Sequence, residues 1–472
     1  MVMQTPEEIL ATFATPDMVV RRNFTAAEKK GSLLFAPDMV DAKAIGQILF
    51  ALEGRNDEIQ NAESLIRRVI YTAEAAAETN IEAVIAGIVA GDCAIWIEGL
   101  DEIVLANVRM REKRGVAEPQ NEAVVRGPRD GFTEDFKTNL SLLQTRLKSA
   151  QLGIKKLKIG RNSNTNAAVV FLANVASPKV VDEVMRRLQS IDIDAVYDSY
   201  NLETFLEYRP RSIFKQVGYT ERPDSAAAKI SEGRVAVVVE GSPVVLTVPF
   251  LLVEDFHSAE DYYQRPAYST FLRYLRLLAL VAAILLPGLY VTLLEFNYDL
   301  SPLRFLVAIM NATKGTPWPP LAEMLIVLLL FEIIRESAIR MPRIVGMAMS
   351  IVGAIVLSET IVRAGIISSP SILIIAVSSI ALFTVPNHIG SFTLLRLLFT
   401  LAGGVFGLYG LLIGSVFLVH YLAGMDSYGT PYLAPFAPLI KQDLGDSLNK
   451  RPLFEAKKRP KSIRNINATR QS

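Results

Sequence analysis

The sequence predicts an α+β and α-helical membrane protein, in which two small α/β cytosolic subdomains precede a helical transmembrane bundle. Three observations support this fold class. Residues 1 to about 270 are charged and mixed in composition, whereas residues 271 to about 422 are mostly apolar. Two nine-residue stretches of the charged half match each other, with four identical positions. The apolar half divides into segments that approach the ~20 residues a helix needs to cross a membrane.

Composition changes along the chain predict five regions. They are an N-terminal tail (1–45), a first α/β subdomain (46–160), a second α/β subdomain (161–265), a transmembrane helical domain (271–422) and a basic cytosolic C-terminal tail (423–472). The net charge is only +1, so no overall field favours nucleic acid, and we expect no nucleic-acid partner. The tail carries nine Lys or Arg against three Asp or Glu from Lys441 onward, and it either contacts anionic lipid or stays in solvent.

Motifs for catalysis are absent from the sequence, which has no Walker A loop, GxGxxG, HExxH, CxxC or GxSxG. Cys93 is the only cysteine, which excludes an intrachain disulfide and a thiolate metal cluster. His257, His388 and His420 are isolated along the chain. We therefore expect no enzymatic activity, no cofactor and no metal site.

The repeated phrase is GDCAIWIEG at 91–99 and GRVAVVVEG at 233–241. An Ala-rich helical segment precedes each copy, and an apolar strand follows it. In the first copy, alternating apolar residues predict strands over 93–98 and 102–108 with a turn at Gly99. The shared order of helix, strand, turn and strand predicts two related α/β subdomains.

Helical spacing of apolar residues predicts further helices in the charged half, over 57–79, 131–152 and 180–191. The stretches IKKLKIG and AAVVFLA, which lie between the last two of these helices, predict strands. These elements complete the two subdomains.

A charge-dense loop, EPQNEAVVRGPRDGFTE at 118–134, lies between the two copies of the phrase. Gly127-Pro128 is turn chemistry, and Arg126 and Arg129 can bind partner carboxylates with two hydrogen bonds each. We therefore predict that these four residues clamp either the second subdomain or a neighbouring subunit. The alternative is a solvated linker.

Five apolar segments follow in the second half of the chain. They are roughly 274–294, 321–338, 343–363, 368–386 and 394–421. The last segment is the longest and contains two GxxxG spacings, which let neighbouring helices approach closely.

The topology predicted from charge requires an even number of crossings. The first ten residues lack a charged stretch followed by an apolar run, so we expect no cleavable signal and a cytosolic N-terminal half. Arg273 and Arg276 at the first apolar segment, and the basic tail, place both ends inside. With five segments, either one is re-entrant or lies flat, with 321–338 the poorest fit, or 302–312 adds a short sixth crossing.

The segment 321–338 carries charges that a membrane helix normally lacks. At 100° per residue, one face gathers a set of charged side chains: Glu332, Arg335, Glu336 and Arg340. Glu323 points to the opposite side, and Glu359 and Arg363 are four residues apart in the next segment. Charges at membrane depth cost a few kcal/mol each, so they indicate a functional role. The alternatives are a surface helix with solvated charges and an interfacial Glu359–Arg363 pair.

Several stretches form a specific combination: VRGPRDGFTE, TNLSLLQTRL, DYYQRPAYSTFLRYLR, PGLYV, the run from LAEMLIVLLLFEIIRESAIR to VRAGIISSP, and PYLAPFAPL. Together they resemble the A subunit of the GerA spore germination receptor family. The resemblance extends from about residue 90 to the tail. It favours the clamp over the solvated linker for Arg126, Gly127, Pro128 and Arg129.

The resemblance implies a protein of the spore inner membrane with a cytosolic N-terminal part. Family members assemble with a transporter-like B subunit and a C subunit that is a lipoprotein, and together they sense nutrients and trigger germination. The A subunit is proposed to oligomerise around an ion-conducting pore. We therefore expect a homo-oligomer in contact with membrane lipid, with a set of candidate pore or gate residues: Glu332, Arg335, Glu336, Glu359 and Arg363.

Two stretches depart from the pattern of the family. Residues 358–365, SETIVRAG, stand where the family tends to have Gln-Ala-Ala-Val-Glu-Ala-Gly, and Thr313-Lys314-Gly315 replaces Arg-Glu-Gly. Both departures lie in the apolar half and point to a divergent branch. A non-conducting scaffold or signalling subunit is the main alternative function, and a secondary transporter is a weaker one because the prolines mostly flank the helices instead of breaking them.

Overall fold

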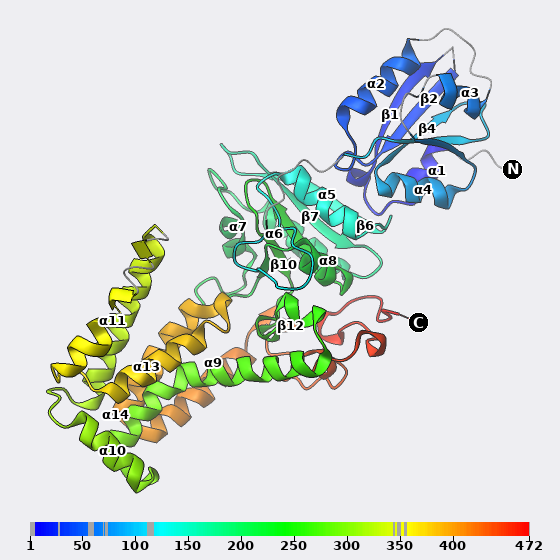
Figure 1. The fold of residues 1–472 in the computed structure, drawn as a ribbon. Helices are drawn as coiled ribbons and strands as arrows, with labels where there is room; N and C mark the ends of the chain where they lie inside the picture. Colours follow the sequence, from blue (N-terminus) through cyan, green and yellow to red (C-terminus); the bar gives the residue numbers. More distant parts are fainter. Residues whose placement is uncertain are drawn as a thin grey trace.

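The computed structural model describes residues 5–26, 29–54, 61–68, 70, 74–110, 118–342, 345–346, 351–353 and 356–471. Two α/β units and a helical region follow one another along the long axis of the molecule, with the N-terminus at the far end of the first unit (Figure 1). Both units are built on a five-stranded antiparallel sheet.

The first unit has the strand order β1-β2-β4-β5-β3. Its strands are β1 (Val20–Ala26), β2 (Lys29–Phe35), β3 (Ala75–Glu78), β4 (Asp92–Ile97) and β5 (Ile103–Asn107). Helices α2 (Ala42–Glu53) and α3 (Ala62–Arg68) pack on one face of this sheet. Helices α1 (Pro6–Ala11) and α4 (Ile81–Ala90) pack on the other face.

The second unit has the equivalent order β6-β7-β9-β10-β8. Its strands are β6 (Leu152–Ile159), β7 (Thr165–Leu172), β8 (Gly218–Thr220), β9 (Val235–Val239) and β10 (Val245–Val248). Helices α6 (Pro178–Gln189) and α7 (Ser199–Leu206) cover one face, and α5 (Phe136–Arg146) and α8 (Pro223–Ser231) cover the other. One buried cluster joins Val84 and Ile88 of the first unit to Leu140 and Ile230 of the second, so the units share an apolar interface.

The predicted repeat is confirmed, because β4 and β9 hold the third position in their sheets. The glycines of the repeated phrase explain why it recurs. Gly91 and Gly233 have φ of 97° and 105° and end helices α4 and α8. Gly99 and Gly241 have φ of 85° and 80° and turn each strand into the next. Other residues are strained in this left-handed region, so these positions keep glycine.

Several predicted boundaries in the charged half are wrong. The predicted N-terminal tail contains α1, β1, β2 and the start of α2, because its apolar residues complete the first sheet. The predicted boundary at residue 160 falls between β6 and β7, and the chain passes from one unit to the next between β5 and α5. The helix predicted over 57–79 lies partly outside the described residues. Its Ala-rich end forms β3 instead, because pairing with β5 overrides helix propensity.

The helical region begins at α9 (Pro266–Glu295), which packs against α13 (Ser369–Leu382) and α14 (Ile389–Ala423). Between them lie α10 (Leu303–Thr313), α11 (Pro320–Arg340) and a π-helical turn, η5 (Val356–Ile361). Gly288 and Gly403 make the contact between α9 and α14 close, since a Cβ on Gly403 would lie 2.6 Å from the Gly288 carbonyl oxygen.

The sequence predicted one long segment over 394–421, but α14 folds back on itself at Gly407. This residue has φ 61° and ψ −148°, which breaks the helix. Ser391 near the start of α14 and Tyr421 near its end both reach the loop at Ser212 and Ile213, through Ser391 Oγ to the Ile213 carbonyl and Tyr421 OH to Ser212 Oγ at 3.0 Å. The two arms therefore run antiparallel, and both outer ends face the second unit.

The C-terminal segment is folded, contrary to a solvated tail. It contains the strand pair β11 (Asp426–Ser427) and β12 (Thr430–Pro431) and the 3-10 turns η7 (Asp443–Asp446), η8 (Leu453–Glu455) and η9 (Lys461–Ile463). Ile463 is buried, the Arg459 Nε donates to the Ser231 carbonyl at 2.8 Å, and the Ile466 amide donates to the Val175 carbonyl at 2.9 Å. These contacts hold the segment against the second unit.

Candidate functional site

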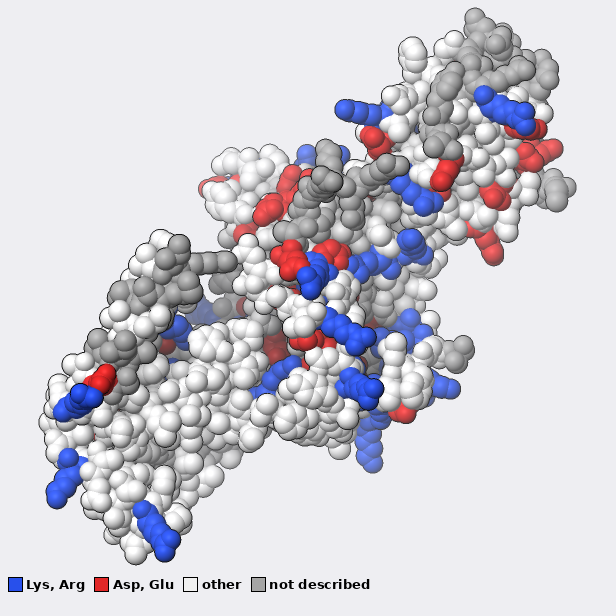
Figure 2. Space-filling model, viewed as in Figure 1, with Lys and Arg blue, Asp and Glu red and all other residues white. Residues whose placement is uncertain are grey.

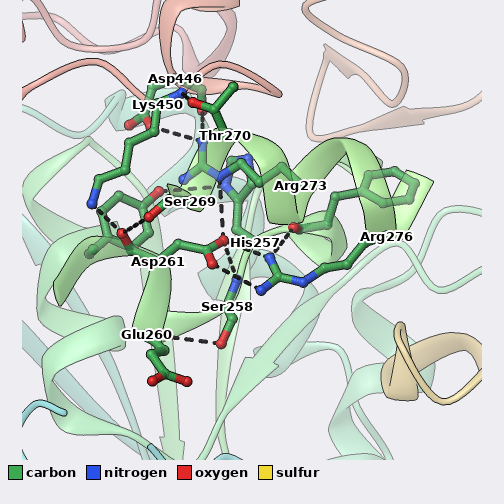
Figure 3. A network of polar contacts seen from close by, with 12 residues as sticks. His257, Ser258, Glu260, Asp261, Ser269, Thr270, Arg273, Arg276, Asp446 and Lys450 are labelled. Atoms are coloured by element: carbon green, nitrogen blue, oxygen red, sulfur yellow. Dashed lines mark hydrogen bonds and ion pairs between the residues drawn. The ribbon is translucent and has the colours of Figure 1, made fainter. Parts of the chain in front are cut away.

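A buried ionic network lies where the second unit, α9 and the C-terminal segment meet (Figure 3). We call it the junction network. Three elements contribute: the connector 252–264, which contains η2 (Leu252–Phe256) and η3 (Ala259–Tyr263), the first turns of α9, and the segment 443–450. Arg273 is 0% exposed and Asp261 1%, so their charges are removed from water and must be satisfied by each other and by their neighbours.

Asp261 is the centre of the junction network. Arg276 donates from both Nη atoms to the two Asp261 carboxylate oxygens at 2.7 and 2.9 Å, a bidentate pair. Arg273, one turn earlier on the same face of α9, places its Nε 3.4 Å from Asp261 Oδ2. Burial alone would raise the pKa of Asp261, but hydrogen bonds from Arg276 and the Ser258 amide hold this pKa below its ordinary value. The carboxylate therefore stays ionised.

The C-terminal segment supplies the other half of the network. Arg273 Nη1 donates to the Ser447 carbonyl at 2.9 Å and to Asp446 Oδ1 at 3.2 Å. Lys450 donates from Nζ to the carbonyls of Asp261 and Gln264, and burial together with the nearby Arg273 lowers the pKa of its ammonium. The segment 443–450 thus fixes the position of the first turns of α9.

His257 is a neutral member of the same network. Its Nε2 lies 2.5 Å from the Ser447 carbonyl oxygen, to which it donates. Burial and the adjacent Arg273 lower the pKa of His257 to about 3, so the ring stays uncharged at neutral pH. This partner of His257 could not be predicted, because Ser447 lies 190 residues away in the chain.

A second buried cluster surrounds Asp255 on the same connector. Lys215 of the second unit lies 2.9 Å from Asp255 Oδ1, and His388, between α13 and α14, places Nε2 2.5 Å from Oδ2. Asn387 also donates to Asp255 at 3.1 Å. Burial acts to raise the pKa of Asp255, but Lys215 and His388 outweigh it and lower this pKa. The connector therefore holds both the root of α9 and the turn between α13 and α14.

The loop 118–134 contacts the second unit through its backbone and its side chains, since Glu122 Oε2 accepts hydrogen bonds from the Thr220 hydroxyl at 2.5 Å and the Glu221 amide at 3.0 Å. Arg222 is buried and donates from Nη2 to the Pro128 carbonyl at 2.8 Å and from Nη1 to the Glu122 carbonyl at 3.1 Å. Gly127 has φ 135°, and a Cβ there would lie 2.8 Å from the ring of Tyr263. The loop therefore touches the second unit and the connector together.

The two arginines predicted to clamp do not make these contacts. Arg126 and Arg129 are exposed, and Arg129 pairs at 3.2 Å with Glu118 inside the same loop. The predicted contact is present in the structure, but the donor is Arg222 on the opposite side.

The charged face of α11 forms the pairs that its spacing predicts. Glu332 pairs with Arg335, and Glu336 pairs with Arg340 at 2.6 Å. Arg335 also donates from Nη1 to Thr393 Oγ1 of α14 at 3.0 Å, which ties the first pair to the helix bundle. The second pair is exposed on the single chain.

The remaining charges predicted for the helical region lie apart from this face. Glu359 and Arg363 form an exposed pair at 2.5 Å, so the structure favours a position at the surface of the chain over a buried pair. Glu323 is 2% exposed and accepts hydrogen bonds from the Ser368 amide at 2.6 Å and its hydroxyl at 2.7 Å. Its carboxylate caps the start of α13, where the helix dipole favours negative charge.

Comparison with known proteins assigns this architecture to a family. The profile of the family described as Bacillus/Clostridium GerA spore germination protein matches residues 7–462. The chain belongs to the GerA family.

Relatives in the GerA family match most of the chain. Spore germination protein KA of Bacillus subtilis (strain 168) is 34% identical over 445 residues, 93% of this chain and 82% of that protein. Spore germination protein GerLA of Bacillus cereus is 34% identical over 419 residues, 88% of this chain and 85% of that protein. A protein of Bacillus subtilis (strain 168) described as the uncharacterized membrane protein YfkQ is 34% identical over 406 residues, 86% of this chain and 79% of that protein. These names support a role in spore germination.

The charged half of this GerA protein is also similar to a solved domain. The crystal structure of the N-terminal domain of the A subunit of the Bacillus megaterium spore germinant receptor GerK3 is 25% identical in sequence. The match covers 52% of this chain and 92% of that chain, with a TM-score of 0.40.

Sequence reasoning missed several buried charges of this GerA chain. Arg222, Asp255, Asp261 and His388 were not candidates, because most of their buried partners are 12 or more residues away in the sequence. Arg396 could have been found, since it is the only Asp, Glu, Lys or Arg in the segment 394–421. A lone charge in an apolar run is itself a functional signal.

Proposed function

We propose that this GerA protein is the A-type subunit of a nutrient germinant receptor of the spore inner membrane. In this proposal it assembles with copies of itself, a transporter-like B subunit and a lipoprotein C subunit, and it has no enzymatic activity, cofactor or nucleic-acid partner. Nutrient binding shifts a two-state equilibrium of the assembly, which requires that the ligand bind the two states with different affinity. The names of its relatives support the role in germination.

The proposed membrane region consists of α9, α11, the predicted segment 343–363, α13 and the two arms of α14. Part of the segment 343–363 lies outside the described residues. By length and composition, two stretches could cross a membrane, Pro266–Glu295 with mean hydropathy 2.5 and Pro386–Ala423 with 2.0. The fold at Gly407 divides the second stretch into two passes. When the two arms of α14 are counted separately, the proposed region crosses the membrane an even number of times. An even number of crossings places the N-terminal half and the C-terminal segment together on the cytosolic side.

Two further features support this placement in lipid. On the face drawn in Figure 2, charged side chains gather over the α/β units and are sparse over the helices. The helices also expose many large apolar side chains, among them Leu278, Leu329, Phe406 and Phe417. Helix α10, with 11 residues, is about 16 Å long, which is too short to cross a hydrocarbon core of about 30 Å.

The observation that carries the proposal is the junction network. It joins α9, the connector and the C-terminal segment through ion pairs that are removed from water, so these parts must move together. A displacement of the membrane helices therefore reaches the second α/β unit through Asp255 and Asp261. Such a link is what a receptor subunit needs in order to pass a signal across the membrane surface.

We further propose that the assembly opens a cation path lined or gated by the predicted set of charged residues: Glu332, Arg335, Glu336, Glu359 and Arg363. Rings of carboxylates favour cations, and in an assembly of identical chains the exposed Glu336 and Glu359 would each form such a ring. The Glu332–Arg335 pair lies against α14 and is placed to respond to movement between helices.

Two measurements test this proposal. Purified full-length protein in a planar bilayer should carry monovalent cation current, whereas a non-conducting scaffold would carry none. Spores that contain E332Q should release monovalent cations at an altered rate when nutrients are added, with an unchanged level of the protein. Unaltered release would remove Glu332 from the cation path.

A further inference from the structure

Arg396 on the first arm of α14 is a buried cation without a carboxylate partner among the described residues. It is 2% exposed, and its Nη1 donates to the hydroxyls of Ser378 at 3.2 Å and Ser379 at 3.0 Å on α13. Its Nε has no hydrogen-bond partner in the described part of the chain. An arginine side chain stays protonated, and its hydrogen-bond partners among the described residues are two neutral hydroxyls.

Glu332 on the neighbouring helix α11 can supply the missing negative charge. Helix α11 and the first arm of α14 run antiparallel, since Leu321 contacts Gly404 near one end and Arg335 binds Thr393 near the other. Moving three residues back along α11 and three forward along α14 from the Arg335–Thr393 bond covers the same rise, about 4.5 Å on each helix. Glu332 is therefore level with Arg396.

Glu332 nevertheless binds Arg335 in this structure, and not Arg396. Arg335 binds Thr393, three residues before Arg396 on the first arm of α14, so both guanidinium groups lie on the side of this arm that faces Glu332. One carboxylate thus stands between two guanidinium groups. Arg335 is a quarter exposed and keeps its bond to Thr393, so it has other partners when Glu332 leaves.

We propose that Glu332 exchanges between Arg335 and Arg396, and that the two pairings belong to the two states of the receptor. This inference rests on the proposed function, because it assigns the partners of a residue of the proposed gate. When Glu332 turns to Arg396, the guanidinium no longer needs the hydroxyls of Ser378 and Ser379. Ser378 also donates to the Ala283 carbonyl of α9 at 2.8 Å, so the exchange acts on the α9–α13 contact. Helix α9 carries this change to the junction network.

The exchange predicts opposite effects for two substitutions that remove the same charge. R335Q removes the partner of the pairing seen here, and R396Q removes the partner of the alternative pairing. One variant should lower the nutrient dose for half-maximal cation release and the other should raise it, each by about tenfold. E332Q should weaken both pairings and give a dose between those of the two arginine variants.

The experiment uses spores of a deletion strain that express the full chain, a dilution series of nutrient broth and a measurement of released monovalent cations. R304Q is the control, because Arg304 is exposed on α10, which lies outside the proposed membrane region. The nutrient dose for half-maximal release in this variant should equal that of the wild type. If R396Q does not accumulate, R396K keeps the charge without the planar donor geometry and should shift the dose in the same direction by less.

Shifts of R335Q and R396Q in the same direction, or no shift in either, would overturn the exchange. If the wild-type chain fails to restore nutrient-dependent release to the deletion strain, the proposed function itself fails, and the exchange with it. A restored wild-type response with parallel shifts in the two variants rejects only the exchange.

Discussion

The two α/β units share one topology but carry opposite charges at the same position of the repeated phrase. Asp92, just after the first glycine of the first copy, pairs with Arg109 beyond β5, with Arg109 Nε and Nη2 at 2.9 and 3.0 Å from the Asp92 carboxylate oxygens. Arg234 holds the equivalent position in the second copy and pairs at 2.9 Å with Glu254 beyond β10. In both units this ion pair joins the start of the strand in the third sheet position (β4 or β9) to the segment that follows the strand in the fourth position (β5 or β10).

The two pairs differ in burial, and this difference separates the roles of the units. The Arg109 side chain is half exposed, whereas Arg234 and Glu254 are both buried, and Lys229 adds a second cation 3.1 Å from Glu254. Burial acts to raise the pKa of Glu254, but Arg234 and Lys229 hold it below its ordinary value. The buried pair begins the connector that continues to Asp255 and Asp261. The repeated stretches thus determine the shared fold of the two units. The segment after the second copy links the second unit to α9 and the C-terminal segment.

The largest effect should come from R234Q. This change leaves the buried Glu254 without its main counter-charge, which should lower the free energy of unfolding of the second unit by about 3 kcal/mol. The matched change R109Q in the first unit breaks a pair open to solvent and should cost at most about 1 kcal/mol. Hydrogen exchange of β4 and β9 amides in the full chain measures both effects. Equal losses in the two units would show that burial does not distinguish the pairs.

The next largest effect should come from D261N. This variant tests whether the connector links the first turns of α9 to the C-terminal segment. Loss of the carboxylate weakens two charge-assisted hydrogen bonds from Arg276 and leaves Arg273 with the C-terminal segment alone, so we expect a local loss of about 2–3 kcal/mol. Hydrogen exchange should rise at the first turns of α9 and in 443–450, while the sheet of the first unit stays protected. E260Q is the control, because the Glu260 side chain points away from the network (Figure 3). Unchanged exchange in 443–450 would contradict the link.

A smaller and equal pair of effects should come from G99A and G241A. Both glycines have left-handed φ, and a Cβ at either position would meet nothing within 4 Å, so only backbone strain opposes the change. Each substitution should cost about 1–2 kcal/mol in its own unit. Thermal unfolding combined with hydrogen exchange gives the two values. Costs that differ beyond experimental error would break the equivalence of the two turns.

The smallest effect should be a pH-dependent gain in the second unit from E203Q. Burial and repulsion from Glu207 raise the pKa of Glu203 on α7 to about 7. An acid whose pKa is raised on folding destabilises the fold progressively as pH rises from the unfolded value of about 4.5 to about 7. The variant should therefore melt at a higher temperature than the wild type at pH 8, and at nearly the same temperature at pH 5. An equal gain at both pH values would rule out ionisation as the cause.

The repeat, the main helices and the charge pairs of α11 were predictable because each depends on residues close together in the sequence. Four glycines at fixed positions and the (i, i+3) and (i, i+4) spacings of Glu332–Arg335 and Glu336–Arg340 carried those predictions. The fold of α14 at Gly407 was not predictable, since the five glycines of this segment look alike and only contacts with α9 and between the arms distinguish them. The junction network depends on pairs such as Arg273 and Asp446, which are 173 residues apart.

The distance between Arg273 and Asp446 also sets an order of events during synthesis. Arg273, Arg276 and Asp261 leave the ribosome long before the residues that complete their network, and the return of α14 at Gly407 is what brings Asp446 and Lys450 back to them. Until that moment the root of α9 holds two arginines against a single aspartate. A nascent chain that stops before residue 443 therefore lacks the acceptors that Asp446 and Ser447 provide for Arg273, and the start of α9 carries an uncompensated positive charge.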